Sequence, residues 1–206
     1  MSTLALFMMY ALAIIAMLAL FLINFYRDPE RKIPSGNNIV SPADGKIISI
    51  LTAKKDKTTI KKGFIGRIEA FAGDIAPECI IISIFMSPLD VHVNRSPING
   101  KVISVKHTPG KYFAAFDLKN SLMNEKNEII IKNGKIGKIK VIQIAGFLAR
   151  RIICDAKKGG NLRKGQRIGK IVLGSQATLI LPSKKVKIKA KEGQKVVAGE
   201  TILAEY

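Results

Sequence analysis

An acid, an imidazole, an amide and a guanidinium fall within six residues, at positions 90–95 (DVHVNR). An imidazole titrates near neutral pH, so His92 could accept or donate a proton, and Asp90 is the carboxylate closest to it in sequence. The stretch directly follows an apolar run at 79–85. A polar cluster at the end of a buried strand suits a catalytic site, and a hydrogen-bonded structural histidine explains the same pattern equally well.

Two further stretches each carry one reactive residue type. In residues 41–46 (SPADGK), Asp44 stands in a Pro/Gly turn, where a carboxylate usually accepts hydrogen bonds from nearby main-chain N–H groups. In residues 172–177 (VLGSQA), Ser175 follows Gly174 between two apolar runs. Taken singly, each pattern is typical of a turn, because serine becomes a nucleophile only beside a base.

Several classes of active site are excluded by what the chain lacks. It has no P-loop, no GxGxxG dinucleotide fingerprint, no HExxH zinc motif and no GxSxG nucleophile elbow. The histidines are His92 and His107, and Cys79 and Cys154 are too few for a disulfide framework or a multi-cysteine zinc site. We therefore expect no bound metal, and proton chemistry must depend on few side chains.

Taken together, the three stretches are specific. The motifs SPADGK, DVHVNRxPxxG and LGSQ occur in this order in the pyruvoyl-dependent phosphatidylserine decarboxylases. The chain resembles the short, single-anchor members of that family, whose archaeal branch acts on archaetidylserine. Residues 109–112 (PGKY) and 146–152 (GFLARRI) are also similar to stretches of these short members. The resemblance extends from about Arg27 to the C-terminus.

The resemblance implies that the protein cleaves itself between Gly174 and Ser175. The Ser175 hydroxyl would attack the Gly174 carbonyl and convert the peptide to an ester, which the absent Cβ of glycine favours. Elimination and hydrolysis would then leave ammonia and a pyruvoyl group derived from Ser175. The products would be a β chain of residues 1–174 and an α chain of residues 175–206, which stay associated.

The resemblance also implies the reaction, which converts a serine phospholipid with diacyl or isoprenoid tails to the ethanolamine phospholipid and CO₂. The pyruvoyl cofactor would form a Schiff base with the serine amine and withdraw the electrons left as CO₂ departs. His92 is the candidate base for self-cleavage and a candidate proton donor in decarboxylation. Asp44 is its expected orienting carboxylate, and Asp90 is the alternative.

Two positions depart from the longer members of the family. Gln176 follows the serine where those members have threonine, and Arg95 stands where their DYHRVH motif has its second histidine, to which the charge relay is assigned. A guanidinium stays protonated near pH 7, so Arg95 cannot act as a base, and the role given to His92 is an inference. Arg95, Arg150 and Arg151 could hold the substrate phosphate or carboxylate, and general surface charge explains them equally well.

The elements that must position these residues begin with an apolar segment. Residues 4–23 form an unbroken run of twenty apolar residues, enough for a helix of roughly 30 Å, the thickness of a bilayer core. The segment lacks the charged start and small-residue cleavage site of a secretory signal, so we expect a retained anchor at 1–26. Every charged residue follows Tyr26, and three basic residues within 27–32 predict a globular part in the cytoplasm.

Beyond a polar connector at 27–43, the pattern predicts strands. Little of the chain has a helical period, and 113–123 is the best candidate for a further helix or a long loop. Gly-spaced segments at 164–169 and 192–203 resemble the hairpins of lipoyl and biotinyl carrier domains in shape only. We predict a mainly β fold, with an N-terminal transmembrane helix and a compact barrel-sandwich-like domain at 44–206. Eight runs rich in Ile and Val are expected strands: 46–51, 79–85, 100–105, 129–131, 138–144, 167–172, 178–181 and 185–190.

The net charge of +19 predicts an anionic partner. A Lys-rich surface from a biased genome is the simpler explanation. Because the anchor already holds the domain at a bilayer, we expect the membrane and a serine phospholipid as partners. Nucleic acid is not expected, since aromatic residues are 6% and Trp is absent. Residues 113–116 (FAAF) are a candidate for a loop that enters lipid, with ordinary core packing slightly favoured.

The alternative function is a membrane-tethered, non-catalytic β-barrel binding module. This hypothesis predicts an intact chain with no need for Ser175, whereas the decarboxylase hypothesis predicts two fragments. The sequence is also compatible with a homo-oligomer of the processed chains, and it does not decide between diacyl and isoprenoid substrates.

Overall fold

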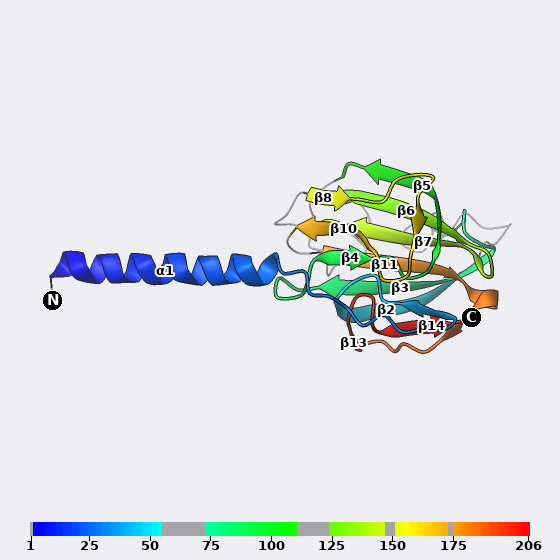
Figure 1. Ribbon diagram of the computed structural model, residues 1–206, viewed down its shortest axis with the longest axis horizontal. Coiled ribbons are helices and arrows are strands. Elements are labelled where there is room, and N and C mark those ends of the chain that lie inside the picture. Colours follow the sequence, from blue (N-terminus) through cyan, green and yellow to red (C-terminus); the bar gives the residue numbers. More distant parts are fainter. Residues whose placement is uncertain (1, 55–72, 111–123, 147–150, 173–174) are drawn as a thin grey trace.

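The structure is a computed structural model, and it describes residues 2–54, 73–110, 124–146, 151–172 and 175–206. Figure 1 shows an elongated molecule in which one long helix extends from one end of a β domain. The prediction of a mainly β fold is confirmed. The helix-or-loop candidate at 113–123 lies outside the described residues.

The N-terminal segment is the helix α1 (Thr3–Phe25), which has 23 residues. The Ser2 hydroxyl caps its start by accepting a hydrogen bond from the N–H of Ala5. Phe25 is its one buried residue, and most of its other apolar side chains are exposed in the described structure. Among the described residues, α1 is the single helix long and apolar enough to cross a membrane. The predicted N-terminal apolar helix is therefore confirmed as a candidate membrane span.

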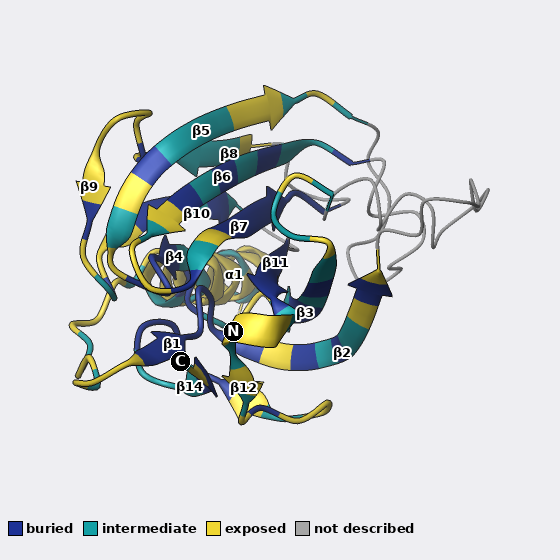
Figure 2. Cartoon of the chain, turned by 90° about the vertical axis from the view of Figure 1, so that its right-hand side faces the viewer, coloured by how far each residue is buried: buried dark blue, intermediate teal, exposed yellow. Residues whose placement is uncertain are grey.

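The largest sheet has eight antiparallel strands in the order β13-β2-β3-β11-β7-β6-β5-β9 among the described residues. Figure 2 shows that this sheet curls around a buried interior. Its members are β2 (Gly45–Lys54), β3 (Glu78–Met86), β5 (Gly100–Thr108), β6 (Lys126–Asn133), β7 (Gly137–Ile144), β9 (Asn161–Leu162), β11 (Ser175–Pro182) and β13 (Lys195–Val196).

Isoleucine and valine favour these strands, because β-branched side chains pack well on a pleated surface. Burial alternates along β2, and the concave face is filled by fully buried isoleucines such as Ile47, Ile82, Ile129 and Ile139. Each of the eight predicted runs overlaps an observed strand.

Two smaller sheets of three strands complete the described part of the fold. One has the order β4-β10-β8 and contains β4 (Val93–Arg95), β8 (Arg151–Cys154) and β10 (Arg167–Val172). The other has the order β1-β14-β12, and a short 3₁₀ turn, η1 (Ser183–Lys185), precedes β12 in the chain. Its strands are β1 (Asn38–Val40), β12 (Lys187–Ile188) and β14 (Ile202–Glu205).

Strand β1 lies inside the segment 27–43 that was predicted to be a polar connector. All three of its residues are buried, and it pairs with β14 near the C-terminus. The end of this segment therefore belongs to the folded domain. Sequence patterning missed it because three residues between Gly and Pro breakers are too few to show an alternation.

A close main-chain contact explains the glycine of the SPADGK stretch. Gly45 has a φ of +144°, and a Cβ at this position would lie 2.1 Å from the carbonyl oxygen of Phe85. Strand β2 begins at this glycine and immediately pairs with β3. Only glycine allows the two backbones to approach this closely.

Replacement of Gly45 by alanine should therefore lower the free energy of unfolding by about 2 to 4 kcal/mol, through backbone strain and collision with Phe85. Denaturant unfolding of the full chain in detergent measures this change. Gly134→Ala is the matched control, because an added Cβ there meets no atom within 4 Å. Equal stability of the two variants would contradict the prediction.

Candidate active site

The fold brings the loop after β3 to both sides of the predicted cleavage site. Ser175, the first residue of β11, pairs with Met86, the last residue of β3. The loop then leads to His92, whose carbonyl oxygen accepts a hydrogen bond of 3.2 Å from the N–H of Ile171 on β10. Gly174 lies between β10 and β11, outside the described residues. His92 is therefore held beside β10, whose last described residue, Val172, precedes this glycine by two positions.

The imidazole of His92 is arranged as a neutral base. The side chain is buried, at 3% exposure, and Nδ1 lies 2.8 Å from the carbonyl oxygen of Asp90. A carbonyl oxygen can only accept, so Nδ1 carries the proton and the lone pair lies on Nε2. Within the described part of the chain, Nε2 is buried and has no hydrogen-bond partner. Burial lowers the pKa of His92, which favours the uncharged form.

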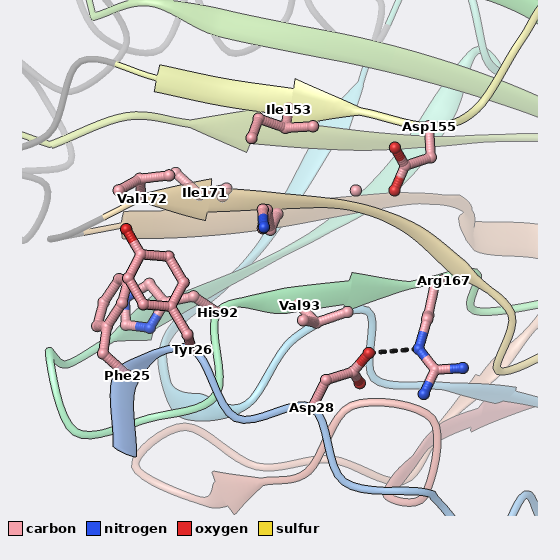
Figure 3. Close-up of a pocket in the computed structure, with 12 residues that line it drawn as sticks. Phe25, Tyr26, Asp28, His92, Val93, Ile153, Asp155, Arg167, Ile171 and Val172 are labelled. Atoms are coloured by element: carbon pink, nitrogen blue, oxygen red, sulfur yellow. Dashed lines mark hydrogen bonds and ion pairs between the residues drawn. The ribbon is translucent and has the colours of Figure 1, made fainter. Parts of the chain in front are cut away.

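The end of α1 covers this imidazole. The ring centroids of Phe25 and His92 are 4.2 Å apart with an interplanar angle of 37°. Phe25 is 3% exposed, and Tyr26 packs against it edge-on at 5.2 Å. Figure 3 shows the three rings grouped on one side of a pocket. The residue that closes the candidate anchor therefore helps to exclude water from His92.

A cavity of about 440 Å³ opens beside these rings. It extends along β10 to Val172, the last described residue before the predicted cleavage site. Figure 3 shows Asp28 and Arg167 paired at the opposite end. The cavity is lined by Phe25, Tyr26, Asp28, His92, Val93, Ile153, Asp155, Arg167, Gly169, Lys170, Ile171 and Val172.

Of the two cations in the cavity, only Lys170 is without an acidic partner in the described structure. Arg167 donates hydrogen bonds to the carboxylates of Asp28 and Glu30. The Nζ atom of Lys170 lies 5.7 Å from the centre of the Tyr26 ring. Lys170 is thus the positive charge best placed to meet an anionic group in the cavity.

Asp44 is bonded elsewhere than to the imidazole it was expected to orient. Its carboxylate accepts hydrogen bonds from Arg31 at 2.8 and 3.0 Å and from the N–H of Ala198 at 2.8 Å. Burial raises the pKa of Asp44, although the Ala198 N–H and Arg31 favour the charged form. The described hydrogen bonds do not bring Asp44 to His92. They tie the segment after α1 to the domain.

The Asp90 carboxylate also has another partner. One of its oxygens accepts hydrogen bonds from the N–H and hydroxyl of Ser87, both at 2.7 Å. The carboxylate therefore shapes the loop, while the carbonyl of the same residue holds His92. Asp90 does orient the imidazole, but through its main chain.

Arg95 is buried and hydrogen-bonded within the protein, so it does not present a free anion-binding site. At 4% exposure, its guanidinium donates to the carbonyls of Gly165 and Pro29 and to the carboxylate of Asp28, all at 3.0 Å. These bonds fasten the chain just beyond α1. They also explain why a permanent charge is tolerated where longer relatives of the motif carry a histidine.

Of the other residues singled out from the sequence, those that the structure describes are not among the residues that line the cavity. Arg151 is exposed at the start of β8, opposite Val172 of β10. Arg150 lies outside the described residues, as does the FAAF stretch at 113–116. Gln176 is buried, and its side-chain amide donates to the hydroxyl of Thr178 at 3.0 Å.

A chain of buried amides supports the site and was not found from the sequence. Gln143 donates to the side-chain oxygen of Asn94 at 3.0 Å and accepts from Asn127 at 2.9 Å. The Asn94 amide in turn points to the sulfur of Met86 at 3.8 Å. This chain links β6, β7 and β4 to the residue that pairs with Ser175. Polar residues within apolar strand runs were the one signal that could have indicated it.

Comparison with known proteins shows a consistent set of relatives. A family model described as phosphatidylserine decarboxylase matches residues 18–204. A putative archaetidylserine decarboxylase proenzyme of Methanocaldococcus jannaschii is 42% identical over 196 residues, which are 95% of this chain and 94% of that protein. A phosphatidylserine decarboxylase proenzyme of Chlorobium phaeobacteroides is 42% identical over 192 residues, 93% of this chain and 82% of that protein. One of Rickettsia akari is 39% identical over 185 residues, 89% of this chain and 74% of that protein.

The bond between Arg31 and Asp44 yields a direct test of what Asp44 does. Both side chains are mostly buried, at 11% and 13% exposure. Asp44→Asn or Arg31→Met should each lower the free energy of unfolding by about 2 to 4 kcal/mol, because each leaves a buried group unpaired. A double-mutant cycle should give a coupling energy of about 1 to 3 kcal/mol.

The exposed pair Lys54–Glu78 is the control for this cycle and should show a much smaller coupling energy. A negligible coupling between Arg31 and Asp44 would contradict the docking role. Loss of self-cleavage in Asp44→Asn but not in Arg31→Met, at equal stability, would instead favour Asp44 as the group that orients His92.

Proposed function

Because the chain belongs to the phosphatidylserine decarboxylase family, we propose that it is a self-processing, pyruvoyl-dependent decarboxylase. It converts a serine phospholipid to the corresponding ethanolamine phospholipid and CO₂. The observation that carries the proposal is the His92 imidazole, which is neutral, buried and has an unused Nε2 lone pair. That imidazole borders a cavity which extends to the strand end preceding Gly174.

The residues near position 175 fit a pyruvoyl group formed there. The unpartnered Nε2 of His92 supplies the buried polar atom that proton transfer to or from this group requires. The backbone pairing of β11 with β3 begins at Ser175, whereas its pairing with β7 begins only at Gln176. In these pairings, position 175 is therefore paired on one side only. When present, the pyruvoyl group supplies an electron sink for the pair released as CO₂ departs.

In self-cleavage, His92 acts as the base. Its Nε2 accepts the proton of the Ser175 hydroxyl as that oxygen bonds to the carbonyl carbon of Gly174. The bond from this carbon to the nitrogen of Ser175 then breaks, and the proton passes to that nitrogen. The Asp90 carbonyl keeps the Nδ1 proton in place throughout. Arg95 takes no proton, because its guanidinium stays charged.

In decarboxylation, the same imidazole takes a proton from the ammonium group of the serine headgroup and then returns it to the carbon that loses CO₂. Phe25 excludes water from this face, so the proton comes from His92 rather than from bulk solvent. Lys170 binds the phosphate or carboxylate of the headgroup, since it is the cavity cation without an acidic partner among the described residues. Arg151 is the second candidate, because it pairs with Val172 at the end of β10.

The strand order supports an α chain and a β chain that remain associated after cleavage. Residues 175–206 contribute β11 between β3 and β7, and β13 beside β2. They also contribute β14, which pairs with β1. The short chain is therefore interleaved with the long one by main-chain hydrogen bonds in two sheets.

In this proposal, the anchor and the lipid tails of the substrate both lie in the bilayer. Exposing lipid tails to water costs roughly 0.8 kcal/mol per CH₂, so the headgroup must be processed at the bilayer surface. Helix α1 crosses the membrane with the β domain on the cytoplasmic side, where the basic residues after Tyr26 are retained. Its last turn then lies at the surface, directly above His92. The proposal assigns the cavity to the headgroup, so it extends to serine phospholipids of either tail chemistry.

Denaturing mass spectrometry of the purified protein tests self-cleavage. The wild-type chain should give fragments 1–174 and 175–206, with the second blocked as pyruvoyl and trapped by borohydride in the presence of an amine. Ser175→Ala should stay an intact chain of 22.5 kDa. His92→Gln should slow cleavage by roughly 10²- to 10⁴-fold.

Ser183→Ala, in the turn η1, is the control and should be processed like the wild type. A wild-type chain that stays intact under all conditions would reject the decarboxylase and leave the membrane-tethered binding module. Cleavage of Ser175→Ala between the same residues would reject the mechanism.

A second prediction concerns Lys170. Lys170→Met should raise the KM for a serine phospholipid roughly tenfold while self-cleavage proceeds normally, since one charge-assisted contact to the headgroup is lost. Lys170→Arg should recover most of the loss. Lys187→Met on β12 removes the same charge far from the cavity and controls for the overall attraction to an anionic surface. Equal KM values for the two methionine variants would contradict a headgroup contact.

A further inference from the structure

Leu89 stands out among the apolar side chains of the β domain. Beyond residue 33, it is the single large apolar side chain that is exposed in the described part of the chain, at 67% exposure. The other exposed large apolar residues lie in α1 or just after it, at Tyr26 and Ile33. Isolated exposed leucines are common on protein surfaces, so any function of Leu89 must be argued from where it lies.

Leu89 lies in a turn that is fixed on both sides. The N–H of Asp90 donates to the carbonyl of Ser87 at 3.0 Å, and the Asp90 carboxylate accepts two hydrogen bonds from Ser87. Leu89, one of the two residues between them, is therefore presented by a closed turn rather than by a loose loop. The same turn ends at His92, whose ring is held by the Asp90 carbonyl.

The turn is bonded to the end of α1. The guanidinium of Arg27 donates to the carbonyl oxygen of Leu89 at 2.7 Å and to the main-chain and side-chain oxygens of Asn24 at 2.6 Å. Arg27 thus joins the last turn of the helix to the tip of the loop. In Figure 1 this loop, between β3 and β4, lies beside the end of α1.

We propose that the turn carrying Leu89 is a second membrane contact, which inserts this side chain into the bilayer surface beside the anchor. The proposal rests on the proposed function, because it takes α1 as the membrane span. The occupant is the lipid bilayer, since the exposed leucine is level with the end of the apolar helix and continuous with it through Arg27. Tyr26, 56% exposed, adds an interfacial aromatic residue at the same level.

The contact has a consequence for catalysis. A lipid-inserted Leu89 and the anchor would hold the turn at two points, with His92 at the end of the same turn. The imidazole and the cavity would then face the layer of headgroups at a constant depth. The stretch at 113–116, which the sequence offered as a candidate lipid-entering loop with core packing slightly favoured, lies outside the described residues.

The absence of tryptophan from the chain permits a direct measurement. Leu89→Trp and the matched control Lys187→Trp each give a protein with one tryptophan. Both are reconstituted as full chains into phosphatidylcholine vesicles with either ordinary or brominated acyl chains. We expect the emission of Leu89→Trp to shift to the blue and to be quenched by the brominated chains, and that of Lys187→Trp to be unaffected.

Equal behaviour of the two tryptophans would overturn the proposal. A blue shift of Leu89→Trp that disappears on dilution of protein in lipid, without bromine quenching, would also overturn it, because a second copy of the chain would then cover the loop. Quenching is independent of activity, so a wild-type chain that neither cleaves itself nor releases CO₂ would reject the proposed function and leave this measurement interpretable.

Activity gives the second readout. Leu89→Asp should cleave itself at the wild-type rate and turn over a dispersed short-chain serine phospholipid normally. Its KM for the same headgroup in vesicles should rise roughly tenfold, as expected for loss of one buried leucine. Leu89→Met should behave like the wild type. Unchanged KM for the vesicle substrate in Leu89→Asp would contradict a lipid contact.

Discussion

Two guanidinium–carboxylate pairs, each with a buried or mostly buried arginine, connect the membrane segment to the catalytic half of the molecule. Arg95 on β4 binds Asp28, and Arg31 binds Asp44 at the start of β2. Burying such charges is costly, so each pair is stable only if the geometry is complete. The contact of Phe25 with the imidazole is supported by them, together with the bonds of Arg27 to Leu89 and of Arg167 to Asp28 and Glu30.

The motif residues therefore divide into a framework and a reactive centre. Asp44 and Arg95 bind the connector, while Asp90 contributes a carbonyl to His92 and a carboxylate to its own turn. The proposed chemistry is left to His92 and Ser175. With arginine at the second histidine position, one imidazole takes both the base and the acid role in this proposal, and its tautomer is set by the main chain rather than by a carboxylate.

Local patterns predicted much of this architecture, and long-range pairings were beyond them. Apolar runs such as 79–85 and 138–144 indicated the central strands, and the family resemblance carried by the three motifs indicated which residues belong to the site. Strands β9 and β13 have two residues each, too few to show a period. The partner of Asp44 could not be predicted, because nothing in the local sequence distinguishes Arg31 from other basic residues. Phe25 was counted with the anchor because it resembles its apolar neighbours.

The central position of β11 means that the proposed cleavage before Ser175 would change the kinetic order of the folding reaction. The precursor folds as one molecule, so its refolding does not depend on concentration. Once the chain is cut, recovery of the same sheet requires two molecules to meet, and an inner strand must enter between β3 and β7. The mature protein would then persist through slow unfolding rather than through reversible equilibrium. Each molecule would acquire its structure as a precursor and keep it kinetically.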